Sequence, residues 1–167
     1  MAKIILIILL VIVILFTLWL FVLTTGLIRT IKKVDSTLSG IDATLIKYQE
    51  LLLNLLEFSP YATYEGTFAL ESMKLRSYMP MAERLKAISE MKQAYQFLTS
   101  TKEISPELKS NEDFKLLHIA VIEKEEYLQT SLRLYNTNTD SLNQKITSFP
   151  IHLVAARLHI KTRAIIN

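Results

Sequence analysis

The pattern of hydrophobic and polar residues divides the chain at residue 28. From Ile4 to Ile28 no residue is charged, and Ile4 to Phe16 is an unbroken run of aliphatic and aromatic side chains. Twenty helical residues rise about 30 Å, which is the thickness of the hydrocarbon core of a bilayer. A helix also satisfies every backbone polar group within the segment, as lipid requires. The pattern therefore predicts an N-terminal transmembrane helix.

Two other interpretations of this stretch fit the pattern less well. A cleaved signal peptide has a shorter apolar core and small residues at its cleavage site, and Leu23-Thr24-Thr25-Gly26 matches such a site poorly. A buried helix of a soluble protein shows a polar face, and no helical period gives one here.

After Gly26 a helical pattern begins with little sign of a linker. Its apolar seam advances in alternating steps of three and four residues, a heptad pattern. The seam consists of Ile31, Val34, Leu38, Ile41, Leu45, Tyr48, Leu52 and Leu55. Because Leu20, Thr24 and Leu27 share its phase, we expect the anchor to continue directly into this helix.

Prolines divide the following segment. Pro60 predicts a kink or short turn near Phe58, and residues 61–79 are expected to be helical. Pro80 marks a second break, so a new helix is expected from Met81 onward. The predicted apolar stripe of this helix is Met81, Leu85, Ile88, Met91, Tyr95 and Leu98.

The last long helix is expected to begin near Asn111. Asn111 is a good N-cap, and the carboxylates of Glu112 and Asp113 would face the positive helix end. A seven-residue series follows: Phe114, Val121, Leu128, Tyr135, Leu142 and Phe149. The companion positions are mixed: His118, Glu125, Leu132, Thr139 and Ile146. A zipper has apolar residues at both positions, so this series indicates one face of a bundle that ends or kinks at Pro150.

The formal net charge of +3 hides an uneven distribution. Between Val34 and Pro150 there are 12 Lys and Arg against 16 Asp and Glu, so this body is acidic. An acidic body repels phosphates, and we therefore expect no nucleic-acid binding. The chain has no Cys, which excludes disulfides, thiolate metal sites and Cys nucleophiles. The basic surplus lies in two flanks, which are expected to face the membrane: Arg29, Lys32, Lys33, Arg157, Lys161 and Arg163.

Four segments, in order, resemble the LemA family of single-pass membrane proteins. They are Glu50–Glu57, Tyr61–Glu65, Ser105–Phe114 and a signature made of Glu125, Tyr135, Asn136, Asn143, Phe149 and Pro150. The sequence departs from the family pattern at Leu53, Leu132 and Leu142, where Pro, Arg and Tyr are usual. The resemblance implies an all-α fold, in which an antiparallel four-helix bundle follows an N-terminal transmembrane helix. The expected domains are an anchor at 1–28, a bundle at 29–150 and a basic amphipathic tail at 151–167.

The sequence offers little catalytic chemistry. His118, His152 and His159 are the only histidines, and no HExxH or equivalent set of three or four metal ligands exists. Glu123 and Glu125 lack the Glu-x-x-His pairing of ferritin-like sites, so a solvated helix face is the better interpretation of these acids. We expect no metal, no cofactor and no enzymatic activity.

The signature residues have two interpretations. Tyr135 lies on the seven-residue seam, where it is expected to pack with its hydroxyl bonded at the bundle edge. Asn136 and Asn143 are expected to bond to a neighbouring helix. The signature is thus predicted to fix packing and register, and a ligand site is the alternative.

Charge also predicts orientation and the place of the tail. Arg29, Lys32 and Lys33 follow the anchor at once, so we expect the N-terminus outside and the bundle in the cytoplasm. Val154, Leu158 and Ile165 would share one helical stripe, so the tail is predicted to lie on the anionic leaflet. The alternatives are a tail that packs on its own bundle and a disordered tail.

These features predict a non-enzymatic, membrane-anchored helical bundle. The expected partners are the lipid bilayer and another protein, or a second copy of the chain. As a scaffold, the bundle would bind that partner or organise the membrane. The alternative is a sensor or ligand-binding bundle, coupled through the continuity between anchor and first helix.

Overall fold

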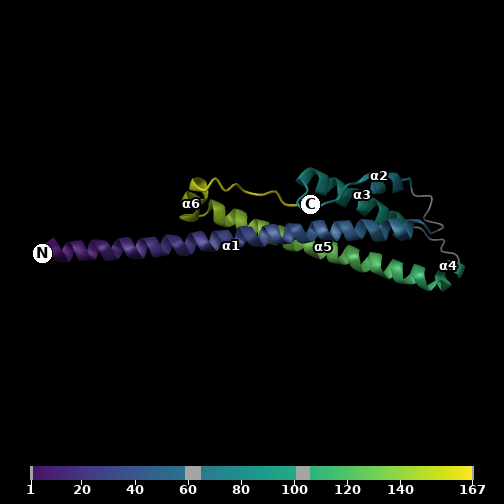
Figure 1. The fold of residues 1–167 in the computed structure, drawn as a ribbon, viewed down its shortest axis with the longest axis horizontal. Helices are drawn as coiled ribbons and strands as arrows, with labels where there is room; N and C mark the ends of the chain where they lie inside the picture. The colour runs from purple at the N-terminus through teal and green to yellow at the C-terminus, as the bar shows by residue number, and fades with distance from the viewer. Residues whose placement is uncertain (1, 59–64, 101–105, 167) are drawn as a thin grey trace. The chain divides into compact units, whose positions relative to one another are not determined.

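The computed structural model describes residues 2–58, 65–100 and 106–166. These residues form an all-α structure with six helices and no strand, which confirms the predicted class, an all-α helical bundle (Figure 1). The helices are α1 (Ala2–Leu56), α2 (Thr67–Ser72), α3 (Met81–Ser100), α4 (Pro106–Ser110), α5 (Glu112–Thr147) and α6 (Ile151–Arg157).

The chain forms two compact units. The anchor unit contains Met1–Ser36 and Tyr135–Ile165, together with Asn167. The bundle unit contains Thr37–Leu134 and Ile166. Each unit therefore combines a part of α1 with a part of α5.

The long helix α1 follows the predicted seam. Its seam residues Val34, Ile41, Leu45, Tyr48, Leu52 and Leu55 are buried. Ile31 and Leu38 are half-buried, as are Leu20 and Thr24 of the anchor, and Leu27 is buried. The apolar side chains before Leu20 are exposed. In the described part of the chain, α1 alone is long and apolar enough to cross a membrane.

Helices α1 and α5 run antiparallel in the bundle unit. The ring of Phe58, after the end of α1, lies 5.6 Å from the ring of Phe114 at the start of α5. Further along, Lys47 of α1 lines the same groove as Tyr127 of α5. The two helices therefore progress in opposite directions along their contact.

The predicted helix at residues 61–79 is wrong over its described second half. Helix α2 ends at Ser72, and residues 73–76 are not helical. The side-chain amide of Gln49, on α1, donates to the carbonyls of Leu70 and Met73. Tyr78 has a positive φ of 60°, and its amide donates to Asp42 at 2.9 Å. These bonds to α1 satisfy backbone groups that a longer helix would satisfy internally. Residues 61–64 lie outside the described residues.

Helix α3 begins at Met81 as predicted, but its buried face is rotated from the predicted stripe. Leu85 is 42% exposed, and Ile88 and Tyr95 are half-buried. The buried residues of α3 are Arg84, Ala87, Met91, Ala94 and Leu98. Arg84 lies on the buried face because it contacts α1, and the small alanines permit close packing on the same face.

Helix α5 confirms the predicted cap and most of the series. The amide of Phe114 donates to Asn111 Oδ1 at 3.0 Å, so Asn111 caps the helix. The first five members of the series and the companions Glu125, Leu132, Thr139 and Ile146 are buried. Phe149 is 79% exposed, so its predicted packing is wrong. The helix ends at Thr147, and the cis Phe149–Pro150 peptide leads into α6.

The predicted helical stripe of the tail is wrong beyond α6. Helix α6 ends at Arg157, and the amide of Ile160 donates to the Ala155 carbonyl at 2.9 Å. His159, with a φ of 54°, donates to Ala156, which completes a Schellman cap. Ile165 therefore lies outside the helix. Residues 160–166 are not helical.

Candidate functional site

A buried ion pair joins α1 to α3 in the bundle unit. Arg84 donates from Nε to Asp42 Oδ1 at 2.6 Å and from its terminal nitrogen to Oδ2 at 2.9 Å. The two side chains are 2% and 1% exposed. Tyr78 donates its amide to the same carboxylate, so the buried charges have several hydrogen bonds. This geometry indicates that the ion pair stabilises the packing of α3 on α1.

The sequence contains a signal for this pair that the predicted stripe did not use. Arg84 lies seven residues before Met91, which lies seven residues before Leu98. Arg84 therefore continues a buried heptad position toward the start of α3. Asp42 follows the seam residue Ile41 on α1, at the flank of the apolar seam.

A second polar cluster lies between α1, α3 and α5. Tyr48 is fully buried, and none of the described residues forms a hydrogen bond of good geometry with its hydroxyl. Burial, and then the nearby carboxylate of Glu125, raise the pKa of Tyr48 far above its ordinary value. Burial and Glu125 also raise the pKa of Tyr95. Both phenols therefore keep their protons at neutral pH, where they cannot act as general bases. Glu125 accepts from Gln129 at 2.8 Å.

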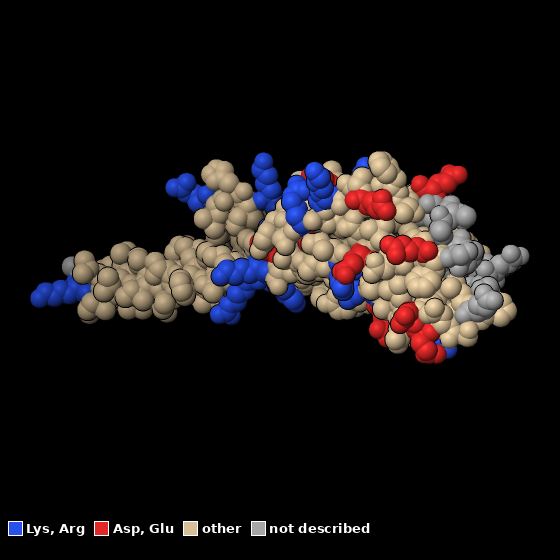
Figure 2. All heavy atoms as spheres, turned by 45° about the vertical axis from the view of Figure 1, so that its right-hand side comes forward, with Lys and Arg blue, Asp and Glu red and all other residues tan. Residues whose placement is uncertain are grey.

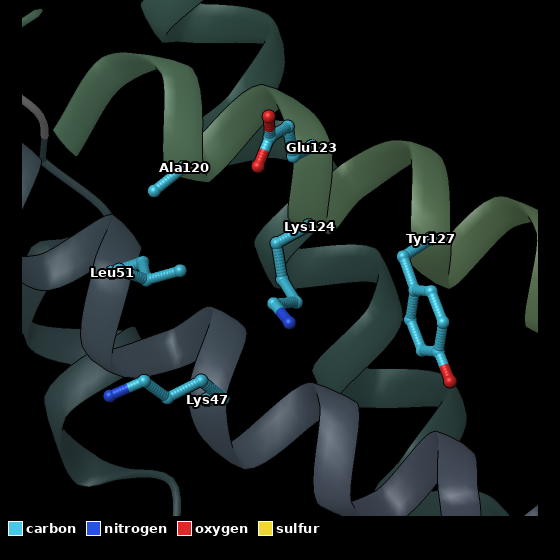
Figure 3. Close-up of a pocket in the computed structure, with 6 residues that line it drawn as sticks. All are labelled: Lys47, Leu51, Ala120, Glu123, Lys124 and Tyr127. Atoms are coloured by element: carbon cyan, nitrogen blue, oxygen red, sulfur yellow. The ribbon is translucent and has the colours of Figure 1, made fainter. Parts of the chain in front are cut away.

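A groove of about 450 Å³ opens on the surface of the bundle unit between α1 and α5 (Figure 3). Its lining residues are Lys47, Leu51, Ala120, Glu123, Lys124 and Tyr127. Figure 3 shows Leu51 and Ala120 directed from the two helices toward the same space. The Nζ of Lys124 lies 5.5 Å from the ring centroid of Tyr127. The groove thus combines an apolar floor with charged and aromatic edges.

The face of α5 beside this groove is also apolar. Leu116 and Ile119 are exposed, and they precede Ala120, Glu123 and Tyr127 at helical spacing. Apolar residues thus lie along about three turns of one exposed helix face. Such a stripe is typical of a surface that another helix covers.

In the anchor unit, two signature residues hold the tail. The hydroxyl of Tyr135 donates to the carbonyl of Ala164 at 2.8 Å. Asn143 donates to the Arg163 carbonyl and accepts from the Arg163 amide, both at 2.9 Å. We call these contacts the tail clamp. The partner of Asn143 is thus the non-helical tail and not a neighbouring helix. Asn136 is half-buried.

The basic residues predicted to face the membrane divide into two groups. Arg163 donates to the carboxylate of Asp35 on α1, so its charge is compensated within the anchor unit. Arg29, Lys32, Lys33, Arg157 and Lys161 are exposed. Near them, the Nζ of Lys145 donates to the Thr30 hydroxyl at 2.7 Å and links the end of α5 to α1.

The histidines lie apart from these contacts. The ring of His118 lies 5.7 Å from that of Phe114, and the ring of His152 lies 6.0 Å from that of Phe149. Across residues 2–58, 65–100 and 106–166, no group of three or more His, Asp or Glu side chains has the geometry of a metal site. The absence of a cofactor and of catalysis stays a prediction.

The fold and these contacts define an all-α bundle whose first helix is long and apolar enough to cross a membrane. Its polar contacts hold helices and tail together. The family model of the LemA family matches residues 37–167, and the chain belongs to the LemA family. Neither the curated proteins nor the solved structures contain a match to the chain. Family membership confirms the resemblance of the sequence motifs.

Proposed function

We propose that the protein is a non-enzymatic scaffold, anchored in the membrane by α1, whose bundle unit binds a helix of another protein. The observation that carries this proposal is the groove between α1 and α5. Leu51 and Ala120 form an apolar floor, and the exposed Leu116 and Ile119 extend it along α5. A partner helix that covers these residues would bury apolar surface, which stabilises association.

The charges at the groove indicate the chemistry of the partner. Lys47 and Lys124 line it with Glu123 and Tyr127. A partner helix with an apolar stripe flanked mainly by carboxylates would complement the two lysines. Such complementarity favours encounter and register more than affinity.

Membrane anchoring and orientation belong to the same proposal. The anchor unit contains eight Lys and Arg against two Asp and Glu, whereas the bundle unit contains eleven against fourteen. Basic residues next to a membrane span favour the cytoplasmic side. We therefore propose that the bundle unit lies in the cytoplasm.

One observation favours a second candidate function, a sensor or ligand-binding bundle. The hydroxyl of Tyr48 is buried, and the Glu125 carboxylate is near it. A small ligand or a proton at this cluster would act on α1, which also contains the apolar stretch. The scaffold is preferred because the groove is open, whereas the cluster is buried.

Photo-crosslinking in the native membrane tests the scaffold. A photoreactive phenylalanine replaces Tyr127 at the groove, and the matched control replaces Phe68, an exposed aromatic residue of α2. We expect one discrete adduct from position 127 and none from position 68. The substitution A120R at the floor should abolish that adduct while circular dichroism stays unchanged.

The mass and the variant dependence of the adduct decide the outcome. An adduct with the mass of two chains would show that the groove mediates self-association and does not bind a helix of another protein. Only lipid adducts at position 127, or an adduct that survives A120R, would overturn the proposed groove.

A further inference from the structure

Helix α6 and the residues that flank it expose apolar side chains, although the backbone of this segment is firmly held. Phe149 and Leu153 are 79% and 57% exposed, and Leu158 is also exposed. The Schellman cap at Ile160 closes the end of α6, and the tail clamp fixes the segment that follows. The exposed apolar group therefore belongs to a built structure and not to a fraying terminus.

The position of α6 on α1 explains this exposure. A groove of about 280 Å³ in the anchor unit is lined by Thr24 of α1 and by Leu153, Val154, Arg157 and Leu158. Thr24 belongs to the uncharged stretch and precedes Arg29 by five residues, which is about 7.5 Å along a helix. Interfacial helices bury their apolar faces about 5–10 Å into the boundary between headgroups and acyl chains. Residues of α1 and α6 thus line one groove at a position along α1 that matches this depth.

Charge complements this depth. Arg157 lines the groove and forms no ion pair with a described carboxylate, in contrast to Arg163, which is paired with Asp35. Figure 2 shows blue Lys and Arg side chains where the tan apolar stretch of α1 ends. Arg29 and Lys32 of α1 and Lys161 of the tail are exposed and belong to the anchor unit. A guanidinium beside apolar side chains matches a phosphate joined to acyl chains.

We infer that α6 is an interfacial element that binds the phosphate of an anionic phospholipid through Arg157 and inserts Phe149, Leu153 and Leu158 at the acyl boundary. The occupant is a lipid of the leaflet at the C-terminal end of the uncharged stretch. Binding would fix α1 and α6 together at this surface. The inference rests on the proposed membrane anchoring, and it is independent of the partner groove on the bundle unit.

The test uses the full chain in vesicles. Because the chain has no native Cys, L153C carries an environment-sensitive fluorophore, and L85C, at an exposed leucine of α3 in the bundle unit, is the matched control. Vesicles contain either phosphatidylcholine alone or equal amounts of phosphatidylcholine and phosphatidylglycerol, each with a lipid-borne quencher. We expect quenching at position 153 that is stronger with phosphatidylglycerol, and none at position 85.

Charge substitutions then test Arg157 directly. R157Q should lower the ratio of inserted to free α6 about fivefold in phosphatidylglycerol vesicles, because one basic residue near an anionic surface contributes about this much. K92Q, at an exposed lysine of the bundle unit, should leave the ratio unchanged. Equal quenching in both vesicle types, or an unchanged ratio in R157Q, would overturn lipid recognition. A response of L153C to inorganic phosphate in phosphatidylcholine vesicles would indicate a free anion and overturn the lipid as occupant.

A separate measurement distinguishes failure of the lipid inference from failure of the proposed membrane anchoring. Resistance to alkaline extraction reports whether the chain spans the vesicle bilayer. A chain that resists extraction but shows no quenching at position 153 would overturn the inference and leave the anchor intact. An extractable chain would overturn the proposed anchoring, and the lipid inference with it.

Discussion

Arg84 and Asp42 show how single residues set the position of a whole helix. Removing two charges from water is costly, and only good geometry with further hydrogen bonds offsets the desolvation. Arg84 meets this condition through two bonds to the carboxylate, which also accepts the Tyr78 amide. The pair therefore specifies one rotation of α3 on α1 and excludes the rotation that would bury Leu85.

Breaking this pair should destabilise the fold strongly. D42A or R84M leaves one buried charge without its partner, and we expect the free energy of unfolding to fall by about 3–5 kcal/mol. The double variant D42L/R84M should recover most of this loss, since it removes both charges. Urea unfolding of the full chain in detergent micelles, followed by circular dichroism, measures these values.

A matched control exists in the same segment. Arg76 forms an ion pair with Glu83 at 2.8 Å, but these side chains are 55% and 49% exposed. R76M should change the free energy of unfolding by less than about 1 kcal/mol, because surface pairs contribute little. If the double variant were as unstable as the sum of the two single variants, the structural role of the pair would be refuted.

At the scale of helices, the sequence predicts those whose burial follows their own periodicity. The seam of α1 and the series of α5 repeat at helical spacing, so most of their buried residues follow from the pattern. Helix α2 is different. Its end depends on Gln49, which lies 21 positions before Leu70. The side-chain amide of Gln49 donates a hydrogen bond to the Leu70 carbonyl. No local pattern around residue 70 contains that contact.

The candidate sites were predictable only in part for the same reason. Tyr135 and Asn143 emerge from the sequence as signature residues, but their partners at Ala164 and Arg163 lie in a tail expected to be helical. The groove requires the register of α1 against α5, which neither helix specifies alone. The sequence thus identifies single candidate residues, whereas the pairing of distant segments in the fold determines which of them form a site.

The tail clamp gives a prediction for an element. N143A removes both side-chain bonds to Arg163, so the tail should open more often. With about 1 kcal/mol for each hydrogen bond, we expect amide exchange at Arg163 to become about tenfold faster or more. Hydrogen-exchange mass spectrometry of the C-terminal peptide measures this rate.

The neighbouring Gln144 supplies the control for that experiment. It is exposed, and Q144A leaves the clamp bonds in place. Unchanged exchange in N143A, or equal acceleration in Q144A, would show that Asn143 does not hold the tail.

At the scale of the molecule, charge follows the two compact units. The anchor unit has a net charge of +6 and the bundle unit −3, counting Lys, Arg, Asp and Glu. The basic excess thus belongs to the unit that contains the apolar stretch, although much of it lies far along the sequence, at Arg157 and Lys161. In the folded anchor unit, Arg157 and Lys161 join the basic residues Arg29 and Lys32 of α1. The basic residues expected to bias the orientation are those that follow the span directly in the sequence, Arg29, Lys32 and Lys33.

This charge predicts the orientation of the chain in cells. With single Cys residues at Ala2 or Ser110, an impermeant maleimide should label intact cells at A2C and not at S110C, and both sites after permeabilisation. Replacing Arg29, Lys32 and Lys33 by Gln should increase labelling at S110C, because basic residues beside the span then no longer favour the cytoplasmic side. The matched control replaces Lys86, Lys92 and Lys115 of the bundle unit, which follow the uncharged stretch by more than 50 residues in the sequence and are therefore not flanking residues. Labelling at S110C without labelling at A2C would place the bundle outside, and the partner helix would then be sought on that side of the membrane.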